Sequence, residues 1–382
     1  MLNKLGQVCD FYSGTGFPVV YQGKDNGELP FYKVGDIAAN VTSGNTYLSF
    51  CSNFISRLEA AELRGTIIPQ NTVVFAKIGE ALKLNRRAIT SCDCLIDNNA
   101  MGIAPKEDVL RVGYFFYFMK YLKMQDYAES TTVPSVRKSK LEQIGINVPY
   151  LDEQKTVEER LNLISDIILK REQELKRLDD LIKARFVEMF GDEKNLMAMS
   201  DICSIITDGT HQPPKFKENG IPFIFVSNVT GDKLTYDAEK FIDQDTYDEL
   251  VKRTPIEIGD VLLSTVGSYG HPAVVKSDKK FLFQRHIAYL KPRREIVDSD
   301  YLHGAILSPE AQRQIEEGVK GIAQKTLNLS EIKKMRIPIP NMDKQKEFAT
   351  FVTQVDKSKA RVQKALDETQ LLFDSLIQEY FG

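Results

Sequence analysis

The sequence lacks the features that mark a membrane protein or a disulfide-stabilised protein. No apolar run approaches the ~20 residues that a membrane-spanning helix needs, and no secretory leader opens the chain. The cysteines are odd in number and lack the spacing of a zinc site: Cys9, Cys51, Cys92, Cys94 and Cys203. We therefore expect reduced thiols, no bound metal, no membrane partner and a cytoplasmic location.

Motifs of catalysis and cofactor binding are also missing. The chain contains neither the phosphate-binding pattern G-x-x-x-x-G-K-[ST] nor the zinc-protease pattern H-E-x-x-H. The loop Phe11-Tyr-Ser-Gly-Thr-Gly16 lacks the third glycine of a dinucleotide site. The string Gln212-Pro-Pro-Lys215 lacks the acidic or amide residue and the aromatic residue that hold a flipped base in amino-methyltransferases. The sequence therefore predicts a chain that is not an enzyme and binds no cofactor itself.

Neither sign of charge is in large excess, because the formal net charge is −3. Any contact with nucleic acid therefore has to rest on local basic patches. Two windows qualify: residues 77–87 hold four basic residues and one acidic residue, and residues 268–294 hold seven and one. The alternative interpretation is that these are solvated charges on loops and strands.

What the sequence does contain is a gap-free internal repeat. Residues 141–191 match residues 332–382 at a constant offset of 191 positions. A repeat of this kind is one structural unit used twice, and it predicts a pseudo-twofold molecule. Identical pairs include Pro149/Pro340, Asp152/Asp343, Gln154/Gln345, Phe190/Phe381 and Gly191/Gly382.

Each copy of the repeat predicts a long helix. Residues 152–190 contain no Gly or Pro and are rich in Glu, Lys, Arg and Leu. Apolar residues recur at alternating steps of four and three over residues 157–189 and again over 348–380, which is the pattern of a coiled-coil seam. Because each helix has a single apolar stripe, we expect the two helices to pair, and the chain order makes the pair antiparallel.

The ends of both helices are marked by the same residue types. Asp152 and Asp343 are expected to be N-caps, because a carboxylate there accepts a free backbone N–H. Gly191 and Gly382 stand where each helix is expected to stop.

The segments that precede the two helices are related more weakly. Short β-branched and aromatic runs broken by Gly, Asn and Asp predict strands joined by turns. The predicted fold class is α+β, with two pseudo-symmetric α+β domains separated by a long antiparallel two-helix coiled coil. The matching stretches are 5–9 with 199–203, 29–36 with 221–228, and 71–79 with 258–267.

Short motifs follow one another in a fixed order in each half of the chain. In the second half they are Asp208-Gly-Thr-His-Gln-Pro-Pro214, Gly220-Ile-Pro-Phe-Ile224, Gly267-Ser-Tyr-Gly270, Gln284-Arg-His-Ile-Ala288 and Gln324-Lys-Thr-Leu-Asn-Leu-Ser330. In the first half they are Lys77-Ile-Gly-Glu80, Asp97-Asn-Asn99 and Thr132-Val-Pro-Ser-Val136. The last string departs from its counterpart at residues 324–330, so the role of this stretch in the first half is less defined. Together with the repeats, these ordered motifs make the chain resemble, over its whole length, the specificity subunit of type I restriction-modification systems.

The resemblance implies a non-catalytic DNA reader with four segments. Residues 1–150 and 192–340 would be target-recognition domains, each binding one half of a split sequence in double-stranded DNA. Residues 151–191 and 341–382 would be helical spacers that set the gap between the halves. At ~1.5 Å per residue the apolar seam of such a spacer is roughly 50 Å long, which is on the order of 15 base pairs.

The resemblance also implies partners. The spacers would dock two methyltransferase (modification) subunits, to which motor-nuclease (restriction) subunits join. S-adenosylmethionine and ATP are expected only on these partner subunits.

The predicted DNA-binding residues lie in loops of the two domains. In the first domain they surround a turn at Gly79 that we expect to project as a hairpin, where Lys, Asn and Arg side chains contact phosphates and the edges of guanine or adenine. In the second domain, the equivalent turn lies between Gly267 and Gly270. The predicted residues are Lys77, Gly79, Lys83, Asn85, Arg86 and Arg87 in the first domain, and His211, Ser268, Tyr269, His271, Arg285 and Lys325 in the second.

Each prediction has a structural alternative. The basic turn is then an exposed hairpin without a ligand, His211 forms a structural hydrogen bond, and Arg285 supports the sheet. For the whole chain, the alternative is a duplicated protein-interaction scaffold without DNA specificity. A gel shift with random duplex DNA, with and without a methyltransferase partner, separates that scaffold from a DNA reader.

Overall fold

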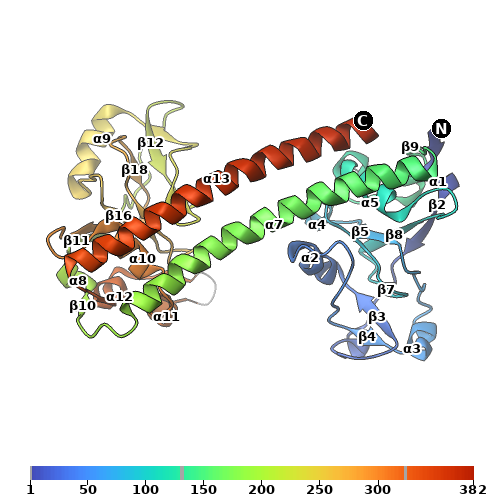
Figure 1. Ribbon diagram of the computed structural model, residues 1–382, viewed down its shortest axis with the longest axis horizontal. Coiled ribbons are helices and arrows are strands. Elements are labelled where there is room, and N and C mark those ends of the chain that lie inside the picture. The colour runs from blue at the N-terminus through green and yellow to red at the C-terminus, as the bar shows by residue number, and fades with distance from the viewer. Residues whose placement is uncertain (1, 130–132, 322–324) are drawn as a thin grey trace. The chain divides into compact units, whose positions relative to one another are not determined.

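The computed structural model describes residues 2–129, 133–321 and 325–382, so that Thr132 and Gln324 of the motifs above lie outside the described residues. Its internal packing divides the chain into two compact units. Unit 1 consists of Met1–Glu172 and Lys364–Gly382, and unit 2 consists of Gln173–Gln363. Each unit contains a portion of both long helices, α7 (Leu151–Phe190) and α13 (Met342–Phe381), which are green and red in Figure 1.

Unit 1 is built on a four-stranded antiparallel sheet of order β2-β8-β5-β6 and a three-stranded sheet of order β4-β3-β7, and β1 pairs with β9. Helix α5 is buried from Gly113 to Met119 and packs in the same core as the sheet. The elements before α7 are β1 (Leu2–Lys4), α1 (Leu5–Val8), β2 (Cys9–Ser13), η1 (Val19–Tyr21), β3 (Leu29–Tyr32), α2 (Val34–Thr42), β4 (Phe54–Ile55), α3 (Arg57–Glu62), β5 (Val73–Ala76), α4 (Glu80–Lys83), β6 (Arg87–Ile89), β7 (Leu95–Ile96), β8 (Ala100–Pro105), α5 (Val112–Tyr121), η2 (Met124–Tyr127), α6 (Lys138–Leu141) and β9 (Gly145–Asn147).

Unit 2 repeats this topology. Its four-stranded sheet has the order β11-β19-β16-β17, its three-stranded sheet has the order β15-β12-β18, and β10 pairs with β22. The elements between α7 and α13 are β10 (Leu196–Ala198), α8 (Met199–Ile202), β11 (Cys203–Asp208), β12 (Ile221–Ile224), η3 (Val226–Asn228), β13 (Val229–Thr230), β14 (Lys233–Leu234), β15 (Phe241–Ile242), α9 (Gln244–Leu250), η4 (Val251–Arg253), β16 (Val261–Ser264), β17 (Pro272–Val274), β18 (Leu282–Phe283), β19 (Ile287–Pro292), α10 (Ser299–Ile306), α11 (Pro309–Gly318), β20 (Val319–Lys320), β21 (Thr326–Leu327), α12 (Leu329–Lys334) and β22 (Arg336–Pro338).

The correspondence extends to the way strands pair. In both units the middle strand of the three-stranded sheet pairs antiparallel with one neighbour and parallel with the other: β3 with β4 and β7, and β12 with β15 and β18. The predicted α+β class with two pseudo-symmetric units and two long helices is therefore confirmed.

The long helices end where the sequence predicted, but their first residues differ. Helices α7 and α13 stop at Phe190 and Phe381, just before the two glycines. They begin at Leu151 and Met342, so the N-cap prediction for Asp152 and Asp343 is wrong: both carboxylates lie in the first turn. There they still interact favourably with the helix dipole. At α13 the capping role belongs to the side chain of Asn341, which accepts a hydrogen bond from the backbone N–H of Lys344 at 3.0 Å.

The two long helices pack antiparallel within each unit. In unit 1, Arg160 of α7 donates to the Tyr380 hydroxyl of α13 at 3.1 Å. In unit 2, Asp179 forms an ion pair with Lys359. Further along α7, the rings of Phe186 and Phe348 lie edge-on with centroids 5.4 Å apart. Among the described residues, no helix is both long and apolar enough to cross a membrane.

A buried glutamine anchors each long helix to its α/β body, and the same three hydrogen bonds recur in both units. In unit 1, Gln154 donates to the carbonyls of Val109 and Pro149, both at 2.9 Å, and accepts from the backbone N–H of Arg111 at 2.8 Å. Both glutamine side chains are inaccessible to solvent, so the repeated pair Gln154/Gln345 is a structural device. In unit 2, Gln345 binds Ile296 O, Pro340 O and Asp298 N at 3.0, 2.9 and 2.9 Å.

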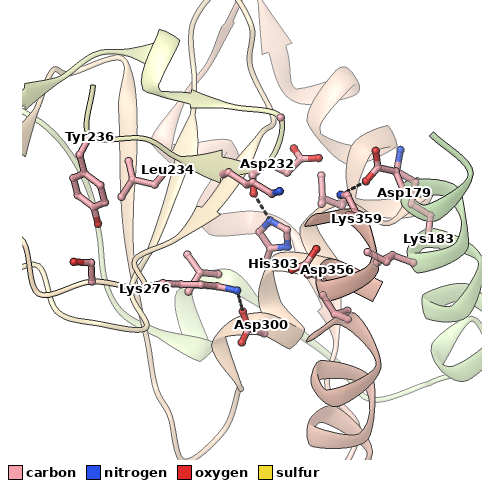
Figure 2. Close-up of a pocket in the computed structure, with 17 residues that line it drawn as sticks. Asp179, Lys183, Asp232, Leu234, Tyr236, Lys276, Asp300, His303, Asp356 and Lys359 are labelled. Atoms are coloured by element: carbon pink, nitrogen blue, oxygen red, sulfur yellow. Dashed lines mark hydrogen bonds and ion pairs between the residues drawn. The ribbon is translucent and has the colours of Figure 1, made fainter. Parts of the chain in front are cut away.

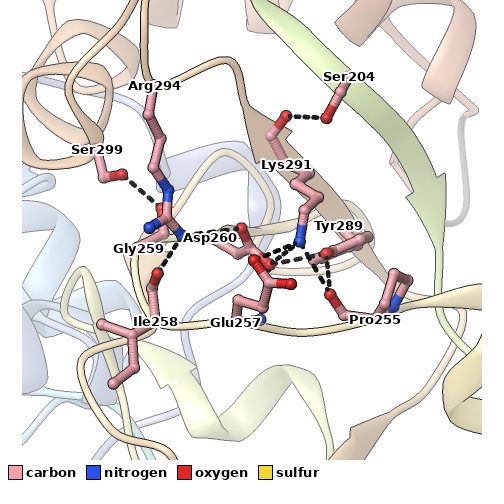
Figure 3. A network of polar contacts seen from close by, with 10 residues as sticks. All are labelled: Ser204, Pro255, Glu257, Ile258, Gly259, Asp260, Tyr289, Lys291, Arg294 and Ser299. Carbon is pink, nitrogen blue, oxygen red and sulfur yellow. Dashed lines mark hydrogen bonds and ion pairs between the residues drawn. The ribbon is translucent and has the colours of Figure 1, made fainter.

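A polar network fixes the loop that leads into β16 (Figure 3). The buried carboxylate of Asp260 accepts from the backbone N–H of Glu257 at 2.8 Å and lies 2.7 Å from the Tyr289 hydroxyl. The ammonium of Lys291 lies 2.9 Å from Glu257 and 3.6 Å from Asp260. Because a buried charge is costly unless it is paired, this network holds residues 255–260 in place directly after Arg253.

Candidate nucleic-acid interface

Four loop segments of unit 2 meet at one end of its sheets, and we call them the loop edge of unit 2: residues 208–212, 265–269, 284–286 and 325–327. Thr210 donates to Phe283 O and accepts from the N–H of Arg285. Thr265 donates to His286 O at 3.0 Å, and Val266 forms a bridge with Thr326. Backbone hydrogen bonds therefore bring together segments that are more than a hundred residues apart in the sequence.

The same junction occurs in unit 1, as the loop edge of unit 1: residues 14–16, 77–80, 97–99 and 133–136. Thr15 donates to Ile96 O, Lys77 donates to Asn99 O, and both bonds are 2.8 Å long. Ile78 forms a bridge with Ser135, as Val266 does with Thr326. These backbone contacts of the edge are thus duplicated, and they carry different side chains in the two units.

A glycine permits the close approach of two segments in each edge. A Cβ atom on Gly14 would lie 1.7 Å from Asp97 O, and one on Gly209 would lie 2.2 Å from Phe283 O. Gly79 and Gly267 both have a φ of 75°, a conformation that favours glycine. The same backbone requirement at paired positions explains why glycine stands at both.

Exposed His211 and Arg253 flank the half-buried Asp208 in a triad of polar side chains on the unit 2 loop edge. His211 Nε2 is 2.8 Å from Asp208 Oδ2, and the guanidinium of Arg253 is 2.5 Å from Asp208 Oδ1. A carboxylate held between a guanidinium and an imidazole orients both groups at the surface. Arg253 and Asp208 were not predicted as site residues, because η4 is remote from the motif in sequence and only the fold brings the two together.

Arg285 and His286 line a shallow cavity of about 280 Å³ beside that triad. Arg285 is exposed, and its Nε lies 3.4 Å from His286 Nε2. Partial burial, and then the charge of Arg285, lower the pKa of His286, so that its imidazole is neutral at neutral pH. The sequence placed His286 beside Arg285 as either a DNA contact or a support of the sheet, but only Arg285 is among the predicted DNA-binding residues.

The remaining predicted residues of unit 2 fall into two groups. Ser268, Tyr269 and Lys325 belong to the loop edge or adjoin it, and the Tyr269 hydroxyl donates to Glu316 at 2.9 Å. The ammonium of Lys325 lies 5.9 Å from the Tyr269 ring centroid. His271 turns elsewhere, because its Nδ1 lies 3.1 Å from Asp232 Oδ1 in the turn between β13 and β14.

In unit 1, Lys77 and Gly79 belong to the loop edge, and the strands β5 and β6 on either side of this loop pair antiparallel as a hairpin, as predicted. Gly79 precedes the short helix α4, which places Lys83 at the surface in an ion pair with Glu80 at 2.7 Å. Arg86 is half-buried. The connection of this hairpin therefore contains a short helix of four residues, which the sequence did not predict.

Arg87 is not exposed, which corrects its predicted place on a surface hairpin. Its side chain is 3% exposed and donates to Met119 O at 3.0 Å, Leu122 O at 3.2 Å and Asn85 Oδ1 at 2.6 Å. Burial lowers its pKa to about 9, which leaves the group charged at neutral pH. Asn85 belongs to the same cluster: it accepts from Arg87 and donates to Leu122 O at 3.1 Å, and its backbone φ is 53°. In this conformation both side chains cap the end of α5 and do not face solvent as DNA ligands.

Comparisons with known proteins give the family. The sequence matches the type I restriction modification DNA specificity domain twice, over residues 2–178 and 192–369. These two matches span most of the chain, so the protein belongs to the family of type I restriction-modification specificity proteins.

Relatives carry the same designation. The chain is 22% identical to the specificity subunit of the type I restriction enzyme EcoBI of Escherichia coli, over 91% of this chain and 84% of that protein. It is 21% identical to the MjaVIII specificity subunit of Methanocaldococcus jannaschii, over 71% of each.

Solved structures share the fold. The S subunit of a type I restriction-modification system from M. genitalium aligns with a TM-score of 0.53 at 12% identity, covering 100% of this chain and 96% of that one. A chain from a study of complex assembly and conformational transition of the type I system aligns with a TM-score of 0.57 at 17% identity, covering 100% and 97%. At these identities the likeness concerns the fold alone.

Proposed function

We propose that this chain is the specificity subunit of a type I restriction-modification complex and reads a split target in double-stranded DNA, one half with each loop edge. The observation that carries the proposal is the duplicated junction: the same backbone hydrogen bonds recur in both units, under different exposed side chains. A constant scaffold with variable tips is what two different half-sites require, because base edges are read by side chains.

The clearest difference between the two edges is at one equivalent position. Asn98 of unit 1 and Arg285 of unit 2 both follow the bridge residue, Asp97 or Gln284, and both are exposed. Asparagine pairs in a bidentate manner with adenine, and arginine with guanine. We assign Asn98 and Arg285 to base reading, and Lys77 and Lys325 to contacts with phosphates.

The other proposed contacts follow from exposure. Lys83, Arg86, Ser268, Tyr269 and His211 lie at or near the surface and remain proposed DNA contacts. Arg253 joins them, because it is exposed beside His211.

The rest of the proposal concerns the complex. The chain itself performs no chemistry in it, and S-adenosylmethionine and ATP bind to the partner subunits. Two methyltransferase subunits and the motor-nuclease subunits assemble on it in the cytoplasm. The names of the relatives, and the structural study of complex assembly that matches this fold, support this assignment.

The decisive experiment maps methylated adenines in DNA treated with the chain assembled with its methyltransferase subunits. A split motif with a constant gap is the expected result. Arg285→Asn should change the sequence of one half only, and Asn98→Arg should change the other half only. The matched control is Lys106→Ala, an exposed cation just after β8 that lies outside both loop edges and both long helices.

Two results would count against the proposal. A contiguous motif would remove the split target, and an unchanged motif in both variants would remove Asn98 and Arg285 from base reading. If the assembled complex neither methylates nor shifts any duplex, the protein-interaction scaffold is the better description.

A further inference from the structure

Unit 2 contains a cavity of about 300 Å³ that plays no part in the proposed reading of DNA (Figure 2). It lies where the β13–β14 hairpin, β17 and α10 meet portions of α7 and α13 that belong to the same unit. Its volume is at the lower end of the range of small-molecule sites. Much of its wall is apolar and consists of Ile182, Leu234, Val274, Leu307 and Val352.

Most charged groups that line the cavity already have partners. Asp179 pairs with Lys359, and Lys276 lies 3.2 Å from Asp300. Asp232 is 3.1 Å from the ring of His271. Figure 2 shows the first two of these pairs on different sides of the cavity. These paired groups are therefore not free to bind a charged ligand.

Two acceptors in the cavity are free. The carboxylate of Asp356, half-buried on α13, has no ion pair or hydrogen bond with any of the residues that the structure describes. His303 Nε2 lies 3.0 Å from the backbone carbonyl of Asp232, which can only accept, so Nε2 carries the proton. The other nitrogen, Nδ1, is then a lone-pair acceptor without a described partner.

The protonation state of His303 supports this tautomer. Burial lowers the pKa of His303, and the positive charge of Lys276 lowers it further. The hydrogen bond to Asp232 and the charges of Asp232 and Asp300 raise this pKa, but by less than burial lowers it. The imidazole is therefore neutral at neutral pH. A third polar atom is the buried hydroxyl of Tyr236, which makes no hydrogen bond with the described residues.

We propose that this cavity is a binding site for a small organic amine, a protonated nitrogen on an apolar or aromatic body. The nitrogen would donate to Asp356 and His303 Nδ1, and the body would contact the apolar wall. Free acceptors beside an apolar surface favour a donor-rich cationic group over an anion, because an anion would face the Asp356 carboxylate. The exposed Lys183 and Lys233 stand at the rim, where water and salt screen their charge.

A bound amine would also link α10, which carries His303, to α13, which carries Asp356. Such a ligand binds the folded state only and therefore stabilises unit 2. One ligand would then contact both the α/β part of unit 2 and the portions of α7 and α13 that pack on it. This inference does not depend on the proposed function in DNA reading.

The test compares three probes of equal size on the full chain without DNA: phenethylamine, 2-phenylethanol and phenylacetate. Calorimetric titration should show that phenethylamine binds at millimolar concentration or below, and at least about tenfold more tightly than either other probe. Asp356→Asn should weaken phenethylamine binding about tenfold, which corresponds to ~1.4 kcal/mol. Asp374→Asn, an exposed carboxylate elsewhere on α13, should leave it unchanged.

A second variant keeps the test decisive if binding is weak. Leu234→Trp fills the cavity and should abolish binding, with folding verified by circular dichroism. Equal binding of the three probes, no binding of phenethylamine, or an unchanged affinity in Asp356→Asn would each overturn the assignment. None of these results bears on DNA methylation, so failure here is distinguishable from failure of the proposed function.

Discussion

The buried glutamines that anchor the long helices give the sharpest prediction about stability. Gln345→Leu keeps the volume and the apolar stem but removes both donors and the acceptor. The carbonyls of Ile296 and Pro340 and the N–H of Asp298 are then left without their partner. The side chain is 0% exposed, so water does not replace the lost bonds without local rearrangement.

The expected cost follows from the number of bonds. Each hydrogen bond contributes ~1 kcal/mol net, and an unsatisfied buried group adds to this, so we expect a loss of about 3–5 kcal/mol in the free energy of unfolding. That is a large share of the ~5–15 kcal/mol that holds a typical domain together. Gln154→Leu should cost the same within about 1 kcal/mol, because its three bonds have matching partners and lengths.

Urea unfolding of the full chain, followed by circular dichroism, measures these losses. Gln354→Leu is the matched control, since this glutamine is exposed on the same helix, and it should change stability by less than about 0.5 kcal/mol. A loss below about 1 kcal/mol for Gln345→Leu would refute the anchoring argument. So would a large loss in one unit without one in the other.

Further predictions concern single groups. Arg87→Met should lower the free energy of unfolding by about 1–3 kcal/mol in urea titrations, because Met119 O loses this donor and Leu122 O keeps only that of Asn85. A neutral result would contradict the structural role. The hydrogen bond from Lys24 lowers the pKa of Glu59 to about 2. The ionised Glu59 therefore contributes its full stabilisation above the unfolded pKa of ~4.3, and this contribution is lost as the pH falls towards 2. NMR titration of Glu59 should show the lowered pKa, and Glu59→Gln should remove this part of the acid dependence of stability. Only Cys92 is exposed among the cysteines, so one thiol should react rapidly with a maleimide at neutral pH, and Cys92→Ser should abolish that reaction. Arg285→Ala should weaken DNA binding by the assembled complex by ~1–3 kcal/mol in gel shifts at fixed salt, unlike Arg87→Met in its folded state.

The parts of the fold that the sequence predicted are those governed by local pattern. The apolar steps of four and three over residues 157–189 depend only on the helix itself, so α7 and α13 were predicted with their ends at Phe190 and Phe381. The N-caps were misplaced by two residues each, because capping at α13 depends on Asn341 and not on Asp343.

The site was predicted less well, because exposure depends on contacts that are remote in sequence. Arg87 belongs to a basic window, yet the carbonyls that bury it come from the end of α5, more than thirty residues later. Arg253 lies outside both basic windows of the sequence, and its place at the loop edge follows from its ion pair with Asp208 and its contact with His211. Asn98 and His286 lay within quoted motifs, but their importance follows from the paired backbone bonds.

The division of α7 and α13 between the two units has a consequence for how the chain folds during its synthesis. The core of unit 1 includes rings from the far end of α13: Phe381 lies 5.0 Å from Tyr114, and Phe373 lies 6.0 Å from Tyr117, between ring centroids. During synthesis, these aromatic residues of α5 therefore stay uncovered until α13 has left the ribosome. Contacts between residues so far apart in the sequence slow folding, and they prolong the time for which hydrophobic surface is exposed to aggregation. A nascent chain halted before residue 364 would hold an unfinished first unit, however completely that segment had been translated.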